Sequence, residues 1–304
     1  MNTERVGKSN SDTNMTKKTK LDFLTRRSFI SKSAVGLVGA SMLVPEFLSA
    51  ADKTKTIGFQ SWIIREEIGK DFPGSLKMMT DLGYNSIEMC SPPGYSKSGF
   101  GSLQNLKPTD LKRIINDAGM TCVSCHFQFE ELKNNLQARV DFAKELGLTQ
   151  MVVASFGLQG KPTMADWKNA AIELNKIGEQ SAKLGMQMCF HNHNTEFEKI
   201  DGQLIYDVLL DQLDPALIKM QFQVWVVIAG YKAADYFRKY PGRFISAHLY
   251  DWSGVGQEQV PLGKGKVDWK EFFEAAKASG VKNYFVEMNM PMLKESAAYL
   301  RTIL

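Results

Sequence analysis

All four histidines of this 304-residue chain fall at or just after the ends of short apolar runs, where they could converge on a metal ion. His126 ends one run, His191 and His193 lie at the end of another, His248 ends a third, and Glu287 ends the last. Imidazole nitrogens and a carboxylate suit the ligand shell of a divalent metal. Each histidine could instead tie down a loop by hydrogen bonds, but the repeated placement favours a metal centre.

Further polar side chains occupy similar positions. Glu88 ends the second apolar run, and Glu196 follows the run that carries His191. Gln221 and Gln223 are two residues apart in the sixth run, so in a strand both would point to the same face. Because an unpaired buried amide costs about 1–3 kcal/mol, two amides in an apolar strand indicate either a polar site or a hydrogen-bonded anchor.

These positions form one site if the chain folds as a parallel barrel. From residue 56 onward, β-prone apolar runs alternate with amphipathic stretches over eight cycles, which is typical of βα units. The predicted strands are 56–61, 86–90, 121–127, 151–155, 187–191, 218–224, 244–249 and 284–287. The predicted helices include 74–82, 107–118, 134–146, 164–184, 204–212, 232–239 and 269–278. In such a barrel the catalytic groups project from the carboxyl ends of the strands.

Glycines mark the ends of several predicted helices, where a left-handed C-cap is expected. They are Gly83, Gly119, Gly147, Gly185 and Gly280. The length from residue 56 to 304 is usual for one α/β barrel of the (β/α)8, or TIM, type. We therefore predict a single domain over 56–304.

Residues 1–50 have the features of a twin-arginine export signal. TRRSFI at 25–30 leads into a small apolar run at 34–40 and a small-residue cleavage sequence at 48–50. The alternative is a basic tail whose paired arginines are accidental. The apolar run is shorter than the roughly 20 residues of a membrane span, so we expect a periplasmic protein with no membrane span.

The N-terminal region accounts for the net charge. It holds eight of the 37 basic and four of the 33 acidic residues, which leaves 29 of each in the rest of the chain. Nucleic-acid-binding domains carry a basic surface. The balanced charge therefore counts against nucleic acid as a partner, and against a DNA-repair endonuclease on the same fold.

The four cysteines lie within apolar runs, at Cys90, Cys122, Cys125 and Cys189. Cys122 and Cys125 are three residues apart, so on a strand they point to opposite faces. A zinc cage would need a second Cys-x-x-Cys pair, which the chain lacks. We expect buried free thiols, although an exported protein could form disulfides.

From about residue 56 to its end, the chain resembles the xylose isomerase-like sugar phosphate isomerases and epimerases. The resemblance rests on HNHNTEF at 191–197, on AG at 229–230, YPGRF at 240–244 and AHLYD at 247–251, and on VPLGKGKVDW at 260–269 with VE at 286–287. These motifs are specific for the family and not for a substrate.

The resemblance implies a divalent ion, which could be Mn, Co, Zn or Mg. It is held in the family by Glu, Asp, His and Glu on strands five to eight, and His248 and Glu287 match the last two. His191 stands in the place of the first glutamate, and Gln223, or less well Gln221, in the place of the aspartate. We assign the metal to His191, Gln223, His248 and Glu287, in a site more positive than the family's because two anions are replaced.

The resemblance also implies chemistry through an enediolate of a bound sugar, stabilised by the ion. Glu287 is the first candidate base. His193 or His126 is the second, because an imidazole titrates near neutral pH. Reprotonation gives isomerisation or epimerisation, which is the activity we assign. Expulsion of a leaving group gives a lyase or dehydratase, and the loss of a carboxylate at His191 favours this alternative.

The substrate is expected to be a neutral carbohydrate, such as a keto-sugar or an oxidised glycoside. No glycine-rich phosphate cradle or Lys/Arg cluster lies at the predicted strand ends. The residues assigned to substrate binding lie in or beside the predicted strand ends, where a tryptophan could stack on a sugar ring and a lysine could contact substrate oxygens: Trp62, Glu88, Glu196, Gln221, Trp252 and Lys264.

A sugar-binding barrel without chemistry is the competing hypothesis, because two ligand positions are substituted. It predicts binding without turnover, whereas an enzyme should lose activity on chelation. The sequence neither requires nor excludes a homo-oligomer.

Overall fold

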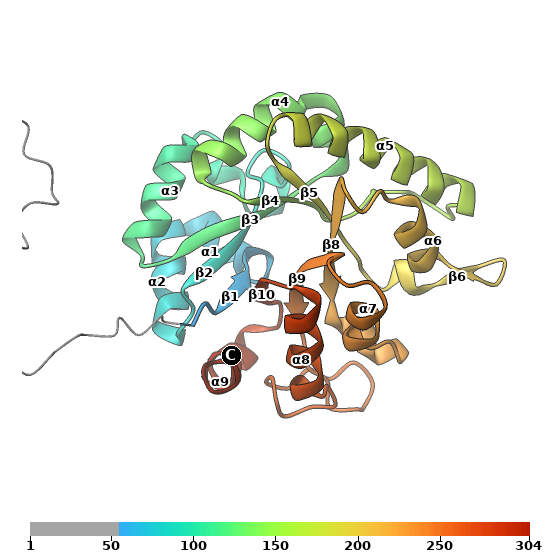
Figure 1. The fold of residues 1–304 in the computed structure, drawn as a ribbon. Helices are drawn as coiled ribbons and strands as arrows, with labels where there is room; N and C mark the ends of the chain where they lie inside the picture. The colour runs from blue at the N-terminus through green and yellow to red at the C-terminus, as the bar shows by residue number, and fades with distance from the viewer. Residues whose placement is uncertain (1–54) are drawn as a thin grey trace, which may run out of the picture. The chain divides into compact units, whose positions relative to one another are not determined.

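The computed structural model describes residues 55–304, which form a closed barrel of eight parallel strands surrounded by helices (Figure 1). Around the barrel the strands follow the order β1-β10-β9-β8-β5-β4-β3-β2. Their bounds are β1 Gly58–Gln60, β2 Ser86–Cys90, β3 Thr121–Phe127, β4 Gln150–Val153, β5 Gln187–His191, β8 Ile218–Gln223, β9 Phe244–Leu249 and β10 Asn283–Val286. The predicted (β/α)8 fold is confirmed, and the predicted export signal lies outside the described residues.

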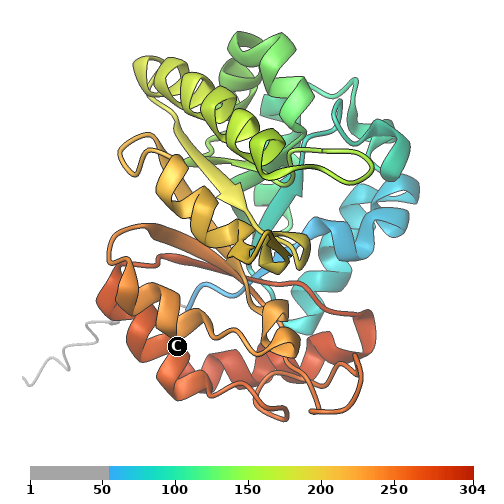
Figure 2. The same ribbon diagram turned by 90° about the vertical axis from the view of Figure 1, so that its right-hand side faces the viewer.

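Helices cover the outer face of the barrel, as a second view shows (Figure 2). They are α1 Arg65–Lys70, α2 Phe72–Leu82, α3 Pro108–Asp117, α4 Phe129–Leu146, α5 Met164–Lys183, α6 Ile205–Gln212, α7 Ala233–Lys239, α8 Trp269–Ser279 and α9 Met290–Ile303. None of these helices is both long enough and apolar enough to span a membrane. The five glycines predicted to cap helices all have positive φ angles, between 76° and 106°.

Short elements join the strands to the helices. The 3-10 helices are η1 Ser61–Ile64, η2 Ser96–Ser98, η3 Gly101–Leu103, η4 Thr195–Phe197 and η5 Val224–Ala229. A two-stranded hairpin, β6 Lys199–Ile200 and β7 Gln203–Leu204, follows β5. Two of these 3-10 helices, η1 and η5, directly follow the carboxyl ends of the barrel strands β1 and β8.

The predicted helices differ from the structure mainly at α4 and α9. Helix α4 begins at Phe129 and not at residue 134, because Gln128 and Glu131 form a capping box there. Asn135 has a non-helical φ of −141°, so the helix kinks there. The predicted start at residue 134 lies next to this kink. Our predicted set omits the short α1 and also α9, which buries Leu293, Ala297 and Leu300 on one face.

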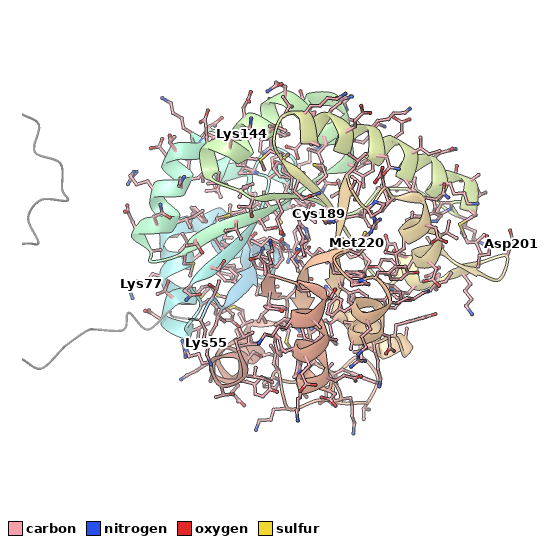
Figure 3. All side chains as sticks on the ribbon, viewed as in Figure 1. Lys55, Lys77, Lys144, Cys189, Asp201 and Met220 are labelled. Atoms are coloured by element: carbon pink, nitrogen blue, oxygen red, sulfur yellow. The ribbon has the colours of Figure 1, made fainter. Side chains whose placement is uncertain are left out.

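The strands are buried on both faces, but the two faces differ in character. On β8, Met220 and Phe222 belong to the apolar core, whereas Gln221 and Gln223 are buried polar residues. Figure 3 places Cys189 and Met220 near the centre of the molecule and Lys77 and Lys144 at its edge. The space inside the barrel is therefore polar near its mouth, which positions the site described below.

The four cysteines are all free thiols, as predicted. Cys90, Cys125 and Cys189 are buried and Cys122 is partly buried. Burial raises the pKa of each of these thiols, so that they stay protonated at neutral pH.

Candidate functional site

A cavity of ≈ 220 Å³ opens at the carboxyl ends of the strands. Five of the predicted site residues line it: Trp62, His126, His191, His193 and Glu287. They come from four strand ends that are far apart in the sequence, β1, β3, β5 and β10. The barrel brings them together because the carboxyl ends of parallel strands meet at one rim.

The imidazoles form a compact cluster at and below this cavity. The ring centroids of His191 and His248 are 4.4 Å apart, and His126 lies 5.1 Å from His191 and 5.2 Å from His248. One nitrogen from each of these three rings lies within 4.8 Å of the others. The ring of His193 packs edge-on against His191 at 4.8 Å. The predicted convergence of the histidines is therefore present.

Glu88 is a completely buried carboxylate beneath the histidines. Its Oε1 accepts from Ser124 Oγ at 2.5 Å and from Gln221 Nε2 at 2.7 Å. Its Oε2 contacts Nε2 of His248 and lies 3.2 Å from Nε2 of His126. Burial alone would raise the pKa of Glu88, but these two imidazoles hold it well below its usual value. Glu88 is therefore an internal anion whose hydrogen-bonding capacity is occupied.

His248 lies between two carboxylates. Its Nε2 contacts Glu88, and its Nδ1 is 2.9 Å from Oε2 of Glu287. Burial alone would lower the pKa of His248, but the two carboxylates raise it to about 9. Burial alone would likewise raise the pKa of Glu287, yet His248 lowers it. Without a metal, this segment of the site is an imidazolium paired with two carboxylates.

Two glutamines at strand ends have the same hydrogen-bonding arrangement. Gln223 Oε1 accepts from the backbone N–H of Trp225 at 3.2 Å, and its Nε2 donates to Glu287 at 2.5 Å. Gln60 Oε1 accepts from the N–H of Trp62 at 3.1 Å, and its Nε2 donates to Glu88 at 2.7 Å. Each amide thus starts a 3-10 helix and holds a carboxylate.

His193 presents an imidazole to the cavity and makes no ring hydrogen bond to any residue of 55–304. Its backbone N–H donates to Glu196 Oε2 at 2.7 Å, which fixes the loop after β5. Burial lowers the pKa of His193, although Glu196 and Glu287 oppose this shift. At neutral pH the ring is uncharged and has a nitrogen lone pair that can accept a proton.

The residues present fit a divalent metal ion. Nδ1 of His191 is buried and has no hydrogen-bond partner within the described part of the chain, which is unusual for an imidazole nitrogen. Burial, together with the neighbouring imidazoles, lowers the pKa of His191 well below its usual value. The ring is therefore neutral, as a metal ligand must be. This unpartnered nitrogen is a candidate to bind a metal ion.

Three of the residues predicted to bind substrate are buried and do not line the cavity. Glu88 and Gln221 have no exposed surface and are engaged in hydrogen bonds below the cavity. Glu196 is 1% exposed and accepts from the N–H of His193 and the hydroxyl of Thr195, so it shapes its own loop. In this structure all three residues form hydrogen bonds that support the site.

Trp252 and Lys264, also predicted to bind substrate, do not line the histidine cavity. Trp252 donates its indole N–H to the carbonyl of Gly256 at 2.9 Å and so packs within the loop between β9 and α8. Lys264 is exposed in the same loop. Both predictions rest on the position of the residue after a strand. That position does not determine the path that a long loop follows.

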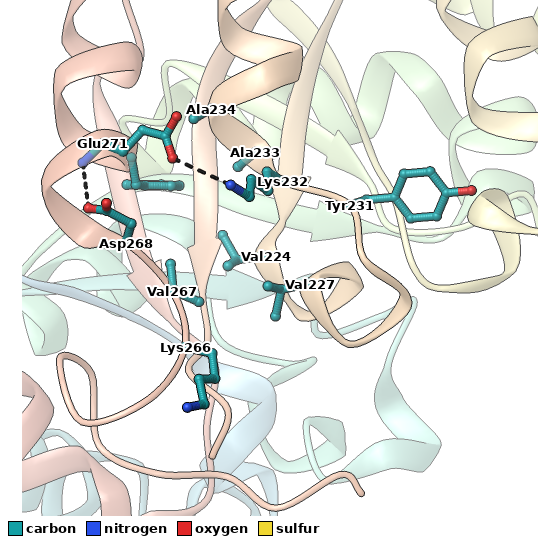
Figure 4. A pocket seen from close by; sticks show the side chains of 11 residues that line it. Val224, Val227, Tyr231, Lys232, Ala233, Ala234, Lys266, Val267, Asp268 and Glu271 are labelled. Carbon is teal, nitrogen blue, oxygen red and sulfur yellow. Dashed lines mark hydrogen bonds and ion pairs between the residues drawn. The ribbon is translucent and has the colours of Figure 1, made fainter. Parts of the chain in front are cut away.

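A second, smaller cavity of ≈ 70 Å³ lies where η5 and α7 approach α8 (Figure 4). Its charged lining residues are Lys232, Lys266, Asp268 and Glu271. Lys232 Nζ is 3.9 Å from Glu271 Oε2, and Asp268 caps α8 by accepting from the N–H of Glu271. None of the predicted site residues lines this cavity, so the histidine cavity is the candidate site.

A polar network below the histidines was not predicted. Gln150 Nε2 donates to Ser124 Oγ at 2.7 Å and to Ser246 Oγ at 3.0 Å, and Gln221 also donates to Ser246 at 3.1 Å. Ser124 is paired with Gln150 in register, and Gln221 with Ser246. The available signal was a polar residue within each of three apolar strands: Ser124 on β3, Gln150 on β4 and Ser246 on β9.

Comparisons with known proteins agree with this architecture. The family model described as xylose isomerase-like TIM barrel matches residues 76–303. An inosose dehydratase from Lacticaseibacillus casei is 24% identical over 261 residues, which cover 72% of this chain and 83% of that protein.

Two solved structures have the same fold. A sugar phosphate isomerase/epimerase from Parabacteroides distasonis superposes with a TM-score of 0.71 at 24% identity, covering 83% of this chain and 96% of that one. A structure of the protein IolI with a bound zinc atom gives a TM-score of 0.59 at 12% identity, covering 82% of this chain and 95% of that one.

Proposed function

Because this chain belongs to the xylose isomerase-like TIM barrel family, we propose that it is a carbohydrate-modifying enzyme that eliminates water or another β-leaving group from a keto-sugar. The relatives support a carbohydrate enzyme, and an inosose dehydratase acts on a keto-sugar as a lyase. This proposal reverses our order of preference from the sequence, in which isomerisation or epimerisation came first.

The observation that carries the proposal is the unequal pair of candidate bases in the cavity. His193 has a free imidazole, whereas the Glu287 carboxylate is held by His248 and Gln223. Epimerisation by two opposed bases is best served by two similar groups, each able to take and return a proton. An elimination needs one base, and a proton for the leaving group.

His193 is the residue to which we assign the proton transfer. Its neutral imidazole takes the proton from the carbon next to the substrate's carbonyl, and the electron pair of that C–H bond forms an enolate. The enolate then forms a carbon–carbon double bond as the adjacent C–O bond breaks. The imidazolium of His193 returns its proton to the departing oxygen, so one water leaves and His193 is regenerated.

Glu287 takes a different role from the one we predicted first. Its lowered pKa makes it a weak base, and two hydrogen bonds fix its orientation. With His191 and His248, it is suited to hold a divalent ion. When bound, that ion supplies electrophilic polarisation of the substrate's carbonyl oxygen. His126 stays a candidate for the site, although its Nε2 is already bonded to Gln221 at 2.7 Å.

The cavity lining supports a neutral substrate. Among its lining residues there is no lysine or arginine, and the one carboxylate is Glu287. Trp62 and Tyr95 provide aromatic surface, and Gln128 and Ser155 provide hydrogen-bonding groups. A phosphorylated sugar would find no fixed cation apart from the imidazoles and a bound metal. A keto-sugar or keto-glycoside fits these properties better.

The proposal is tested by incubating the purified protein in D2O with inosose and with a 3-keto-glucoside, and following both by NMR and mass spectrometry. We expect a dehydrated or cleaved product whose formation stops on chelation and resumes when a divalent ion is added. An isomer that carries deuterium next to the carbonyl, with no elimination product, would show epimerisation or isomerisation instead. Tight binding without conversion would identify a sugar-binding barrel.

A further inference from the structure

The hydrogen bonds around the histidines point to a metal ligand set different from the one that the family resemblance implies. We propose that the ion is held by three imidazoles, His126, His191 and His248, together with Glu287, and that Gln223 is not a ligand. This inference rests on the proposed metal-dependent function. It also names the class of ion: a late first-row transition metal such as Zn²⁺, and not Mg²⁺ or Mn²⁺.

Gln223 is excluded by its own contacts. An amide binds a metal through its oxygen, but Oε1 of Gln223 accepts from the N–H of Trp225, while Nε2 donates to Glu287. Turning the amide over would break both bonds at once. Gln60 makes the same pair of contacts at the end of β1. Gln223 is therefore a positioning residue that orients Glu287.

His126 can supply the fourth ligand atom that Gln223 cannot. Gln221 donates its Nε2 to Glu88 and to Ser246, so its Oε1 is the acceptor in the 2.7 Å contact with His126. Nε2 of His126 must therefore carry the hydrogen. In the neutral ring this leaves Nδ1 with a lone pair that can bind a metal.

His248 and His191 follow the same pattern. Nε2 of His248 donates to the carboxylate of Glu88, so Nδ1, which lies 2.9 Å from Oε2 of Glu287, is the nitrogen that would bind an ion beside that carboxylate. Nδ1 of His191 is buried without any hydrogen-bond partner in the range 55–304. Each of the three rings can thus offer a nitrogen to a metal, and one nitrogen from each lies within 4.8 Å of the other two.

Glu88 completes the arrangement from below. A buried carboxylate that receives the N–H of a ligating histidine fixes its tautomer and increases its basicity. Glu88 does this for His248 and lies 3.2 Å from the same nitrogen of His126. Its negative charge also offsets part of the charge of a divalent ion.

A donor set of three imidazoles and one carboxylate selects among ions. Imidazole suits Zn²⁺, Ni²⁺, Cu²⁺ and Fe²⁺, whereas Mg²⁺ and Mn²⁺ prefer sets dominated by carboxylate and water. A family site with three carboxylates and one histidine would accept Mg²⁺ or Mn²⁺. In this chain two acidic positions are neutral, and β3 adds a third imidazole. These changes shift the preference of the site towards ions such as Zn²⁺.

The test measures metal binding directly and requires no turnover. Metal-free wild-type protein is titrated calorimetrically with ZnCl2, CoCl2, MnCl2 and MgCl2, and the visible absorption of the Co²⁺ form is recorded. We expect one site per chain, with Zn²⁺ bound at least 100-fold more tightly than Mn²⁺. Equal or tighter binding of Mn²⁺ or Mg²⁺, or no binding of Zn²⁺, would overturn the inference on the wild-type chain alone.

Matched variants test the ligand set. His126→Ala should weaken Zn²⁺ binding by more than about 100-fold and change the Co²⁺ spectrum, because it removes a ligand. Gln223→Ala removes only a partner of a ligand, and should weaken binding by about 10-fold and leave the spectrum unchanged. The reverse order of effects would overturn the assignment. Turnover of a keto-sugar by the Mn²⁺-loaded protein with no Zn²⁺ preference would contradict this inference while leaving the proposed function intact.

Discussion

The side-chain amide of Gln223, at the end of β8, donates a 2.5 Å hydrogen bond to the carboxylate of Glu287, which follows β10. These strands are not neighbours, because β9 lies between them. The bond therefore passes over the end of β9, and it reaches Oε2 of Glu287, the oxygen that also contacts His248. Glu287 is held at one oxygen by both partners, which leaves its other oxygen for the cavity.

Gln223→Ala should therefore lower turnover of a keto-sugar by about 10- to 100-fold, the usual effect of removing a partner of a ligand. Glu287 would keep its charge but lose part of its orientation. Steady-state kinetics measure the effect, and Gln137→Ala, which removes an exposed amide that bonds to Asp141, is the control. Unchanged kinetics for Gln223→Ala would contradict a role for this bond.

His193→Ala should reduce kcat by about 10²- to 10⁴-fold, because the variant loses its general base. The residue is not one of the proposed ligands, so the variant should still bind metal. Parallel measurements of kcat and of metal stoichiometry separate the two roles. His193→Gln keeps a polar side chain without a titratable group, and it should be as inactive as the alanine variant. Full activity in either variant would show that His193 is not the general base, and would assign that role to Glu287 or His126.

The fold was predictable because it depends on local patterns that repeat. All eight barrel strands lie within two residues of their predicted bounds, and the caps at Gly83 and Gly280 have the expected left-handed conformation. Apolar runs and helix caps act over a few residues, so one sequence suffices to detect them. Helix α9 is the main omission, and it shows the same spacing of buried residues as the others.

The residues that converge on the site were also predictable, but the contacts among them were not. The four histidines and Glu287 lie close together because the topology places strand ends at one rim. Whether Glu88 faces a substrate or a histidine depends on register and on side-chain direction across the barrel. Neither the register nor the direction of a side chain can be read from a residue's position in the sequence. The same is true of Trp252 in a loop. Its indole bonds to Gly256 of the same loop, which its place after a strand does not reveal.

Trp62→Ala and Trp252→Ala separate two tryptophans that follow strands in a similar way. Trp62 lines the cavity, and the guanidinium of Arg65 lies 4.5 Å from its ring. Trp252 does not line the cavity. We expect Trp62→Ala to raise KM for the sugar by about 10-fold, which corresponds to about 1.4 kcal/mol, and Trp252→Ala to leave KM within about twofold. An equal rise in both variants would argue against sugar stacking on Trp62.

Glu88→Ala should destabilise the metal-free protein by about 3–5 kcal/mol. The charge of His248 would lose its buried partner, and removing one member of such a pair has that effect. Glu88→Gln keeps the volume, but its NH2 group would face donors that need an acceptor, so we expect a smaller loss. Urea unfolding measures both variants. Glu145→Ala, at an exposed position, should change stability by no more than about 0.5 kcal/mol. A loss below about 1 kcal/mol for Glu88→Ala would show that the network can rearrange.

Asp251 organises the long loop between β9 and α8 and gives a test of stability away from the chemistry. The carboxylate is buried and accepts five hydrogen bonds, from the backbone N–H groups of Trp252, Gly263, Gly265 and Val267 and from Nε1 of Trp269. A substituent on Gly265 would meet this carboxylate, since a Cβ there would lie 2.1 Å from Oδ1. The loop is therefore wrapped closely around one buried acceptor.

Asp251→Ala should lower the free energy of unfolding by about 3–5 kcal/mol, because an unpaired buried donor costs about 1–3 kcal/mol and water can satisfy only some of these. Asp268→Ala is the matched control. Asp268 is also an acceptor in this loop, but it makes a single cap bond of 2.9 Å to Glu271 at the exposed start of α8. Loss of a helix cap costs about 1 kcal/mol. Urea denaturation of both variants measures the difference. Equal losses would mean that the loop does not depend on its buried carboxylate, and that its backbone donors find other partners when Asp251 is removed.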